Sequence, residues 1–169
     1  MDAEGIHKLV SEQFGSAISP LEKTKGFHFF EVDPMKVDEV AEMLKSHDEL
    51  RMDSLSNLTG VDHPENDKIT VVYDLESFSL RHQIAMKVDT DRAAPKTKTV
   101  EGVWRAAGWL EREVYDLLGV DFIGHHDLRR ILLPDDWVGF PLRKDYVEAP
   151  EYHGISTVRE SIMNLPGRQ

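Results

Sequence analysis

A pair of strands joined by a short turn is the feature that most constrains how this chain can fold. Residues 68–76 (KITVVYDLE) are rich in β-branched side chains, which favour extended backbone. After a turn at residues 77–79, apolar and polar side chains alternate over residues 80–88. An alternation with a period of two puts successive side chains on opposite faces of a strand. The pattern therefore predicts a hairpin with one buried face and one wet face.

Two amphipathic helices are predicted before this hairpin. Apolar side chains recur at helical spacing across residues 3–15, and Gly15 is a typical helix end. A second apolar stripe covers residues 37–44. The dipeptide Asp33-Pro34 is a helix-start signal, because Asp can cap a helix and Pro fits its first position.

Further strands are predicted around these helices. Residues 17–19 are expected to form a short strand, followed by a polar turn over residues 22–26 and a strand of β-favouring side chains over residues 27–32. Residues 52–61 alternate imperfectly and are expected to form another strand. That strand ends in a turn over residues 62–67, which is rich in Pro, Asn and Asp.

A long helix is predicted after the hairpin. Residues 89–99 have the composition of a mobile loop, and Thr99 is expected to cap the helix that follows. The helix is expected over residues 100–118, with an apolar stripe turned inward. Residues 111–113 (ERE) are expected to turn their charges to either side of that stripe. The helical period stops after Gly119.

The predicted order is helix, two strands, helix, three strands and a long helix, followed by an irregular C-terminal extension. Such segregated runs favour an α+β, two-layer domain over a doubly wound sheet. We expect one domain over residues 1–146. Residues 147–169 carry two prolines, two glycines and little apolar periodicity, so we expect an extended tail that becomes ordered on a partner.

Composition excludes several classes of function. The chain has 20 Lys and Arg against 31 Asp and Glu, and its net charge of −11 would repel nucleic acid. The absence of cysteine excludes disulfides, thiolate zinc sites, iron–sulfur ligation and thiol nucleophiles. No apolar run approaches the roughly 20 residues that cross a bilayer, so membrane association is expected only through a partner.

Residues 111–146 are the densest part of the chain in charge, aromatic side chains, Gly and Pro, so an active site is the first hypothesis for them. His125, His126 and Asp127 could ligate a metal ion and serve a small metal-dependent enzyme. Adjacent residues seldom point at one ion, however, and no remote His or Glu pair completes a ligand set. The alternative is a turn in which one His hydrogen-bonds the backbone and Asp127 caps the next segment.

The acidic side chains of the predicted helix do not suit a catalytic pair. Glu111 and Glu113 are two residues apart, so they point to different faces of a helix and cannot share a substrate. The favoured interpretation is an ion-pair network that ties the helix to the basic pairs at 129–130 and 143–144, since Arg and carboxylate side chains fix geometry well.

Recognition suits this segment better than catalysis. The sequence contains no Gly-rich phosphate loop and no serine in a nucleophile-elbow context. Local acids nearly cancel the basic pairs, which disfavours an anion site. Trp137, Phe140, Tyr146 and several Arg are residue types that anchor protein interfaces. We therefore favour a docking surface over residues 111–146.

A long and specifically spaced pattern runs through this segment: Glu111-Arg112-Glu113, Asp116-Leu117-Leu118, His125, Arg129, Ile131 and Leu132. This pattern resembles the signature of the C-type subunits of NADH:quinone oxidoreductase, which are hydrophilic peripheral-arm subunits of respiratory complex I. The pieces LTGVDHPE (58–65), GWLEREVYDLLG (108–119) and LLPDDWVGFPLRKDY (132–146) are also similar. The resemblance covers residues 50–146 well and the N-terminal third by element order.

The resemblance implies an α+β fold with a mixed sheet and no prosthetic group in this chain, whereas the whole complex would carry FMN, iron–sulfur clusters and quinone. It implies a non-catalytic structural and assembly subunit of a proton-translocating NADH:quinone oxidoreductase, inactive on its own. It also implies docking on the large quinone-site subunit beside iron–sulfur subunits, at the cytoplasmic face of the cell membrane. A fused C/D form is not expected, because the chain ends at Gln169.

Two alternatives stay open. One is the equivalent subunit of a membrane-bound energy-converting hydrogenase or of a deazaflavin-dependent dehydrogenase, and the other is the metal-dependent enzyme described above. On the resemblance, the residues expected to hold the junction of helix and extension and to contact the partner are Glu111, Arg112, Glu113, Asp116, His125, Arg129, Arg130, Trp137, Phe140, Arg143, Lys144, Asp145 and Tyr146.

Overall fold

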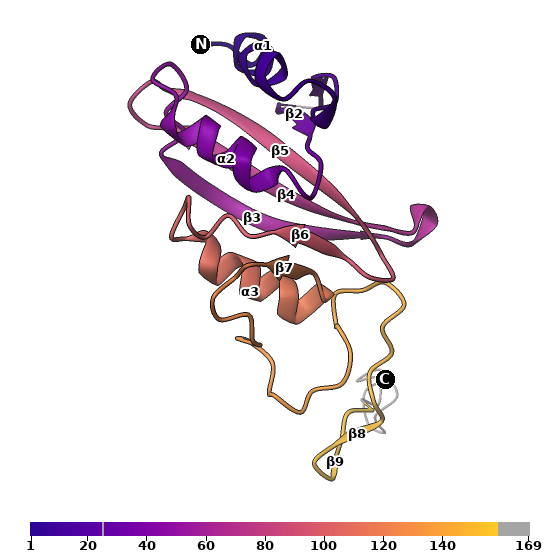
Figure 1. Ribbon diagram of the computed structural model, residues 1–169. Coiled ribbons are helices and arrows are strands. Elements are labelled where there is room, and N and C mark those ends of the chain that lie inside the picture. The colour runs from indigo at the N-terminus through magenta and orange to yellow at the C-terminus, as the bar shows by residue number, and fades with distance from the viewer. Residues whose placement is uncertain (25, 159–169) are drawn as a thin grey trace, which may run out of the picture.

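A five-stranded mixed sheet lies at the centre of the fold. The computed structural model describes residues 1–24 and 26–158. Its strands, in spatial order, are β1 (Glu22–Lys23), β2 (His28–Glu31), β5 (His82–Asp91), β4 (Lys68–Ser77) and β3 (Ser54–His63) (Figure 1). Strands β2 and β5 run parallel, and the other neighbours run antiparallel. The predicted mixed sheet is therefore confirmed.

The predicted hairpin is strands β4 and β5, paired without a break from Lys68 with Asp91 to Ser77 with His82. The odd-numbered residues 69–75 and the even-numbered residues 82–88 are buried, and the alternate positions are mostly less so. One face of the hairpin thus lies against the core and the other is wetter, as the alternation predicts.

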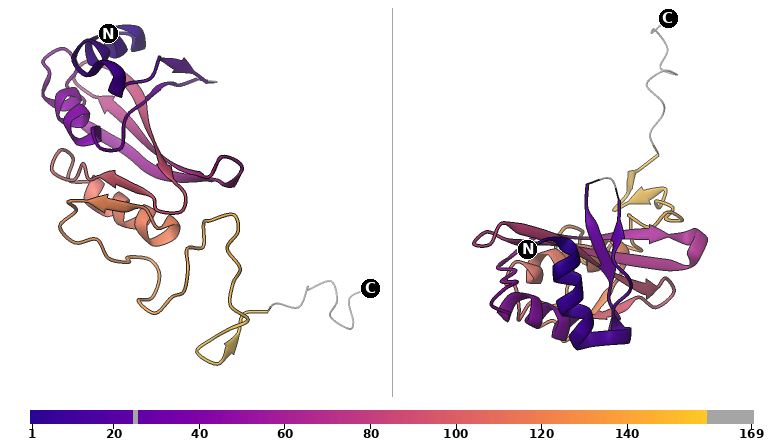
Figure 2. Two further views of the ribbon diagram at one scale, coloured as in Figure 1. Left: turned by 45° about the vertical axis from the view of Figure 1, so that its right-hand side comes forward. Right: turned by 90° about the horizontal axis from the view of Figure 1, so that it is seen from above.

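Helices pack on the buried face of this sheet. Helix α1 (Ala3–Phe14), helix α2 (Val37–Ser46) and helix α3 (Ala107–Leu118) contribute to a single apolar core with the strands. The view from above separates the helices from the sheet as two layers (Figure 2). Helix α3 meets strand β3 at Gly60, where an added Cβ would overlap the Leu118 side chain. The two-layer α+β prediction is confirmed.

The N-terminal third differs from the prediction in its short elements. The strand expected over residues 17–19 is a 3₁₀ turn, η1 (Gly15–Ala17), followed by one isolated bridge between Ile18 and Val32. The segment expected as a polar turn contains β1 instead, which pairs with β2. Strand β1 is exposed on both sides, so its polar side chains give no alternating pattern.

The region between the hairpin and the third helix also needs correction. Strand β5 continues to Asp91, and β6 (Lys96–Lys98) pairs in parallel with β7 (Asp121–Ile123), so the loop expected over residues 89–99 is partly strand. Helix α3 begins at Ala107 rather than at residue 100. Thr99 caps no helix: its hydroxyl accepts the Glu101 N–H at 3.1 Å and starts a turn.

The extension leaves the sheet domain after β7 and runs below helix α3 (Figures 1 and 2). Its only regular structure within the described residues is a small hairpin of β8 (Glu151–Tyr152) and β9 (Ile155–Ser156). Residues 159–169 of the predicted tail lie outside the described residues. None of the helices that the structure describes is long and apolar enough to cross a lipid bilayer.

Candidate functional site

Asp116, on helix α3, binds the start of the extension. Its buried carboxylate accepts hydrogen bonds of 2.7–3.0 Å from three consecutive backbone N–H groups, those of residues 131–133. The Arg130 guanidinium lies 2.7 Å from its other oxygen. Burial alone would raise the pKa of Asp116, but these hydrogen bonds outweigh burial and lower the pKa, so the carboxylate is charged at neutral pH. We call this group the Asp116 cluster.

Arginine side chains hold the irregular path of the extension. Arg130 also donates to the carbonyls of Trp137 and Gly139, each at 3.1 Å. From the helix, Arg112 donates to the carbonyls of Arg129 and Arg130 at 3.1 and 3.2 Å. Guanidinium groups offer five donors in a rigid plane, which suits several carbonyls at once. The predicted tie between helix and extension exists, although most of its contacts reach backbone oxygens.

Phe140 packs on Gly119 at the end of helix α3. Gly119 has a φ of +79°, which glycine adopts readily, and an added Cβ would lie 2.6 Å from the Phe140 ring. Arg143 donates to the Leu118 carbonyl at 2.8 Å, and its guanidinium lies 4.9 Å from the centre of the Phe140 ring. A cation there is stabilised by the partial negative charge of the helix end. The helix end therefore also positions the extension.

A second buried acid, which the sequence prediction missed, anchors the far end of this segment. Asp62 lies near the end of β3, and Arg92 donates to both of its carboxylate oxygens at 2.6 and 3.0 Å. Arg92 also donates to Asp145 at 2.6 Å, and the Lys144 N–H donates to Asp62 at 2.7 Å. The hydrogen bond from Arg92 is the main cause that lowers the pKa of Asp62. We call these four residues the Asp62 cluster.

Glu111 does not lie on the surface as predicted. Its side chain is fully buried and accepts hydrogen bonds from the Thr99 hydroxyl at 2.5 Å and from the Val100 N–H at 2.8 Å. Burial raises the pKa of Glu111 to about 7, because no Lys or Arg within the described chain pairs with it. Glu111 therefore joins helix α3 to the turn before it, and it offers nothing to a partner's surface.

The predicted His125, His126 and Asp127 set does not converge, but Glu101, a remote residue that the prediction did not include, brings a carboxylate oxygen within 4.8 Å of one ring nitrogen of each histidine. One Glu101 oxygen accepts the backbone N–H of His126 at 2.7 Å, and the other lies 2.7 Å from the Nδ1 atom of the same residue. Both ring nitrogens of His125 are hydrogen-bonded within the chain. Its Nδ1 accepts the backbone N–H of Asp127 at 3.0 Å, so its Nε2 carries the proton and donates to the Gly108 carbonyl at 2.9 Å. The arrangement matches the predicted alternative of a histidine-stabilised turn more closely than a metal site.

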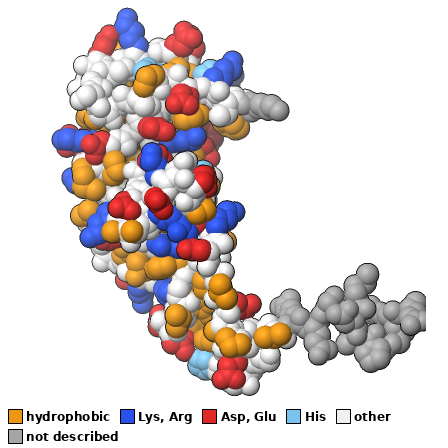
Figure 3. All heavy atoms as spheres, turned by 90° about the vertical axis from the view of Figure 1, so that its right-hand side faces the viewer, with side chains coloured by type: hydrophobic (Ala, Val, Ile, Leu, Met, Phe, Trp, Pro, Cys, Tyr) orange, Lys and Arg blue, Asp and Glu red, His pale blue; other side chains and the backbone are white. Residues whose placement is uncertain are grey.

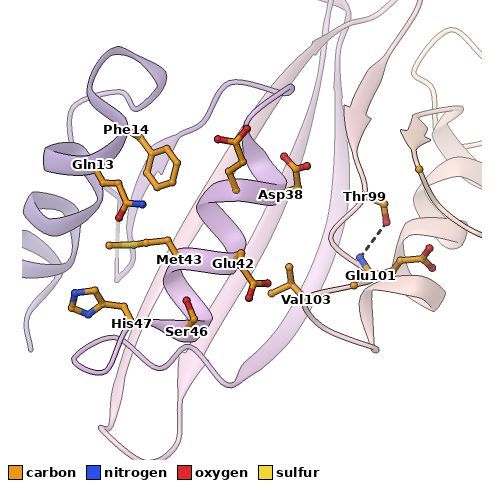
Figure 4. Close-up of a pocket in the computed structure, with 13 residues that line it drawn as sticks. Gln13, Phe14, Asp38, Glu42, Met43, Ser46, His47, Thr99, Glu101 and Val103 are labelled. Carbon is orange, nitrogen blue, oxygen red and sulfur yellow. Dashed lines mark hydrogen bonds between the residues drawn. The ribbon is translucent and has the colours of Figure 1, made fainter.

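A groove of about 920 Å³ lies between helices α1 and α2 and the turn after Thr99 (Figure 4). Phe14, Met43 and Val103 line it together with several carboxylates. Three of its four acidic side chains are paired: Asp38 with Lys98 at 2.9 Å, Glu39 with Lys36 at 2.7 Å, and Glu101, which turns away from the groove, with His126. The Glu42 side chain has no hydrogen bond or ion pair within the described residues. Of the hydroxyl side chains that line it, Thr99 donates to the buried Glu111 carboxylate at 2.5 Å, which holds it in the turn before helix α3.

The extension exposes large apolar side chains along its length. The predicted anchors Trp137, Phe140 and Tyr146 are half-buried against the chain itself. The large apolar side chains of the extension that do face solvent are Leu132, Val138, Leu142, Val147, Ile155 and Val158. Val138 and Val147 are 83% and 85% exposed. Figure 3 shows apolar side chains gathered over the lower part of the molecule, where the extension lies.

The remaining predicted residues lie at the edge of this surface. Glu113 is exposed on helix α3, and Arg129 is exposed beside Asp127 at 3.0 Å. Lys144 and Asp145 are exposed but tied to the Asp62 cluster. Most of the predicted charged residues therefore bind the chain to itself, whereas Glu113 is exposed and has no ion pair within the described residues.

Several known proteins are similar to this chain in sequence. The family described as respiratory-chain NADH dehydrogenase, 30 Kd subunit, matches residues 30–152. The C subunit of NADH-quinone oxidoreductase from Chlorobium phaeobacteroides is 43% identical over 155 residues, which cover 90% of this chain and 93% of that protein. The C/D subunit of NADH-quinone oxidoreductase from Phocaeicola vulgatus is 48% identical over 109 residues, which cover 64% of this chain and 21% of that protein.

The fold has a solved counterpart as well. A chain in the structure of the membrane-bound sulfane sulfur reductase, an archaeal respiratory membrane complex, is similar with a TM-score of 0.71 at 25% sequence identity, over 85% of each chain. The spaced signature, the mixed sheet and these matches agree. The chain therefore belongs to the family of the 30 Kd subunit of respiratory-chain NADH dehydrogenase, and it is similar over most of its length to proteins named as the C subunit of NADH-quinone oxidoreductase.

Proposed function

We propose that this chain is a structural, non-catalytic subunit of a proton-translocating NADH:quinone oxidoreductase, and that its extension, residues 127–158, docks on the large quinone-site subunit. One observation carries the proposal. The extension has almost no regular secondary structure, yet two buried carboxylates fix its path while large apolar side chains face outward. An ordered segment that exposes apolar groups is typical of a protein interface.

The cost of burying charge supports this interpretation. Asp116 and Asp62 have no exposed side-chain area, and each is matched by an arginine and by backbone N–H groups. Burying an ion costs several kcal/mol unless such partners compensate it. These clusters hold in place residues 127–146, the part of the extension that has no helix or strand of its own. We infer that the shape of the extension is what the clusters preserve.

The relatives indicate which partner to expect. In Phocaeicola vulgatus a similar sequence lies within a protein named as a C/D subunit, so the C-like part and the D part are one protein there. A covalent fusion keeps two parts adjacent, which supports a D-type subunit, taken in this proposal to be the large quinone-site subunit, as the neighbour of this chain. Peripheral attachment at the cytoplasmic face of the membrane, with no prosthetic group in this chain, completes the proposal.

Co-purification tests the proposal. The tagged chain, expressed in its native membranes, should bring down the large quinone-site subunit and iron–sulfur subunits. The double variant Val138→Glu, Leu142→Glu should lose most of that recovery while its melting temperature stays unchanged, because both side chains face solvent. Phe78→Glu, an equally exposed apolar position at the β4–β5 turn, is the matched control and should keep the partners. Recovery of the unaltered chain as a lone monomer would sink the proposal.

A second candidate rests on the solved counterpart. The chain is similar to 85% of a chain from a membrane-bound sulfane sulfur reductase. This similarity supports an equivalent role in a respiratory complex that uses another electron donor, such as an energy-converting hydrogenase complex or a deazaflavin-dependent dehydrogenase complex. Mass spectrometry of the co-purified electron-input subunits separates the two candidates. Stoichiometric zinc, iron or manganese in the purified chain, lost on His125→Ala, would instead support the metal-dependent enzyme.

A further inference from the structure

A second surface, at the start of helix α3, has a different chemistry from the apolar extension. A pocket of about 550 Å³ lies between the turn before the helix and the turn at residues 126–129. Three arginines, Arg105, Arg112 and Arg129, line it together with Trp109. Trp109 is 64% exposed, which is unusual for the largest apolar side chain.

The charge of this pocket is opposite to that of the whole protein. The chain carries a net charge of −11, whereas three arginine side chains line this one pocket. Asp127 balances part of this charge, since it lies 3.0 Å from Arg129 and 3.7 Å from Arg112. Glu101 is bonded to His126. Within the described residues, Arg105 has neither an ion pair nor a hydrogen bond through its side chain, so its charge is available to a ligand.

The pocket also has a rigid floor. Arg112 is mostly buried, because its other donors hold the carbonyls of Arg129 and Arg130, and its guanidinium lies 5.4 Å from the Trp109 ring. The first turn of helix α3 opens here, and its N-cap, Ala106, provides no side-chain cap. The partial positive charge of that helix end adds to the guanidinium groups. Exposed Trp beside Arg is the composition of interface hot spots.

We propose that this pocket binds an acidic segment of a neighbouring subunit, with Trp109 as the apolar anchor and Arg105 and Arg129 as carboxylate-binding side chains. Planar guanidinium groups match carboxylates in a bidentate geometry. An anionic membrane surface fits less well, because the protein's overall negative charge would be repelled by it. The inference rests on the proposed function, and the pocket is continuous with the proposed docking surface because Asp127 and Arg129, which line it, belong to the extension.

Photo-crosslinking in the purified native complex tests the inference. The variant Trp109→p-benzoylphenylalanine should crosslink to another subunit, within a peptide whose net charge is negative. Arg105→Glu should weaken retention of the chain in a salt wash by about tenfold, and changing the crosslinked acid to Lys should restore it. Lys23→Glu is the matched control, since Lys23 is exposed on the distant strand β1, and it should leave retention unchanged.

Several results would overturn the inference. These are a crosslink to lipid, a crosslink to a neutral or basic peptide, the absence of any crosslink, or Arg105-dependent binding of the chain to phosphatidylglycerol vesicles. If the chain still co-purifies with its partners in those cases, the proposed function stands and only the acidic-segment inference fails. A chain that never co-purifies would remove both.

Discussion

The Arg130 guanidinium lies 2.7 Å from the Asp116 carboxylate, and this ion pair joins helix α3 to the extension that follows it. The same carboxylate accepts the N–H groups of residues 131–133. One side chain of the helix therefore determines the path of four consecutive residues.

Asp116→Asn should destabilise the fold and release the extension. The amide group cannot accept on both sides, so either Arg130 or the three N–H groups lose their acceptor. Breaking a buried pair in this way costs about 3–5 kcal/mol. Chemical denaturation should show that loss, and limited proteolysis should cut near residues 130–140. Glu113→Gln, exposed on the same helix, is the control and should do neither.

Glu111 should make the protein less stable as the pH rises. Its pKa is raised from 4.5 to about 7 in the folded state, so the unfolded chain ionises first. The stabilisation is complete below pH 4.5 and is lost as the pH rises to about 7, an amount of about 3 kcal/mol. Glu111→Gln should remove this loss, because an amide can still serve Thr99 and Val100. Equal pH slopes from pH 5 to 8 for both proteins would contradict the prediction.

Asp62 should make the protein less stable as the pH falls. Its pKa is lowered from 3.8 in the folded state, first by Arg92, so its stabilisation is present above pH 3.8 and is lost as the pH falls through the lowered pKa. Asp62→Asn should lower stability at pH 7 and flatten the acid side of the stability profile. Hydrogen exchange of the Lys144 amide should speed up in the variant. An unchanged exchange rate would show that this hydrogen bond does not hold the extension.

Gly119→Ala should loosen the junction between helix and extension. The added methyl group would meet the Phe140 ring and force a positive φ on a residue that disfavours it. We expect a loss of about 2 kcal/mol or more, seen as a lower melting temperature. Gly102→Ala is the matched control, because its φ is ordinary and no atom lies within 4 Å of the added carbon.

Much of the fold could be predicted from local sequence pattern. The alternation over β4 and β5 and the apolar stripes of α1 and α2 are set by residues a few positions apart. Strands β6 and β7 could not be predicted, because they are short, polar at most positions and paired across 25 residues. The predicted start of α3 was wrong for a related reason. Trp104 has the helical spacing, but its indole N–H donates to the Met52 carbonyl at 2.8 Å and fixes a turn.

The site was predicted in part. The expected ion-pair network between the helix and the basic pair at 129–130 is present in one contact, that of Asp116 with Arg130. The spacing could not show that Glu111 is buried, because its partners lie before the helix. Asp62 and Arg92 are 30 residues apart and no period links them. The only sequence signal for Asp62 is its place in the piece LTGVDHPE, within the region of family resemblance.

The hydrogen bond from Lys144 to Asp62 spans 82 positions of the chain, and it bears on when this protein becomes competent to assemble. During synthesis, β3 emerges long before residue 144 does, so Asp62 waits without this contact until the domain is nearly complete. The docking segment can take its final path only after the sheet has formed beneath it. A partner that recognises the ordered extension would therefore select finished molecules over nascent or truncated ones.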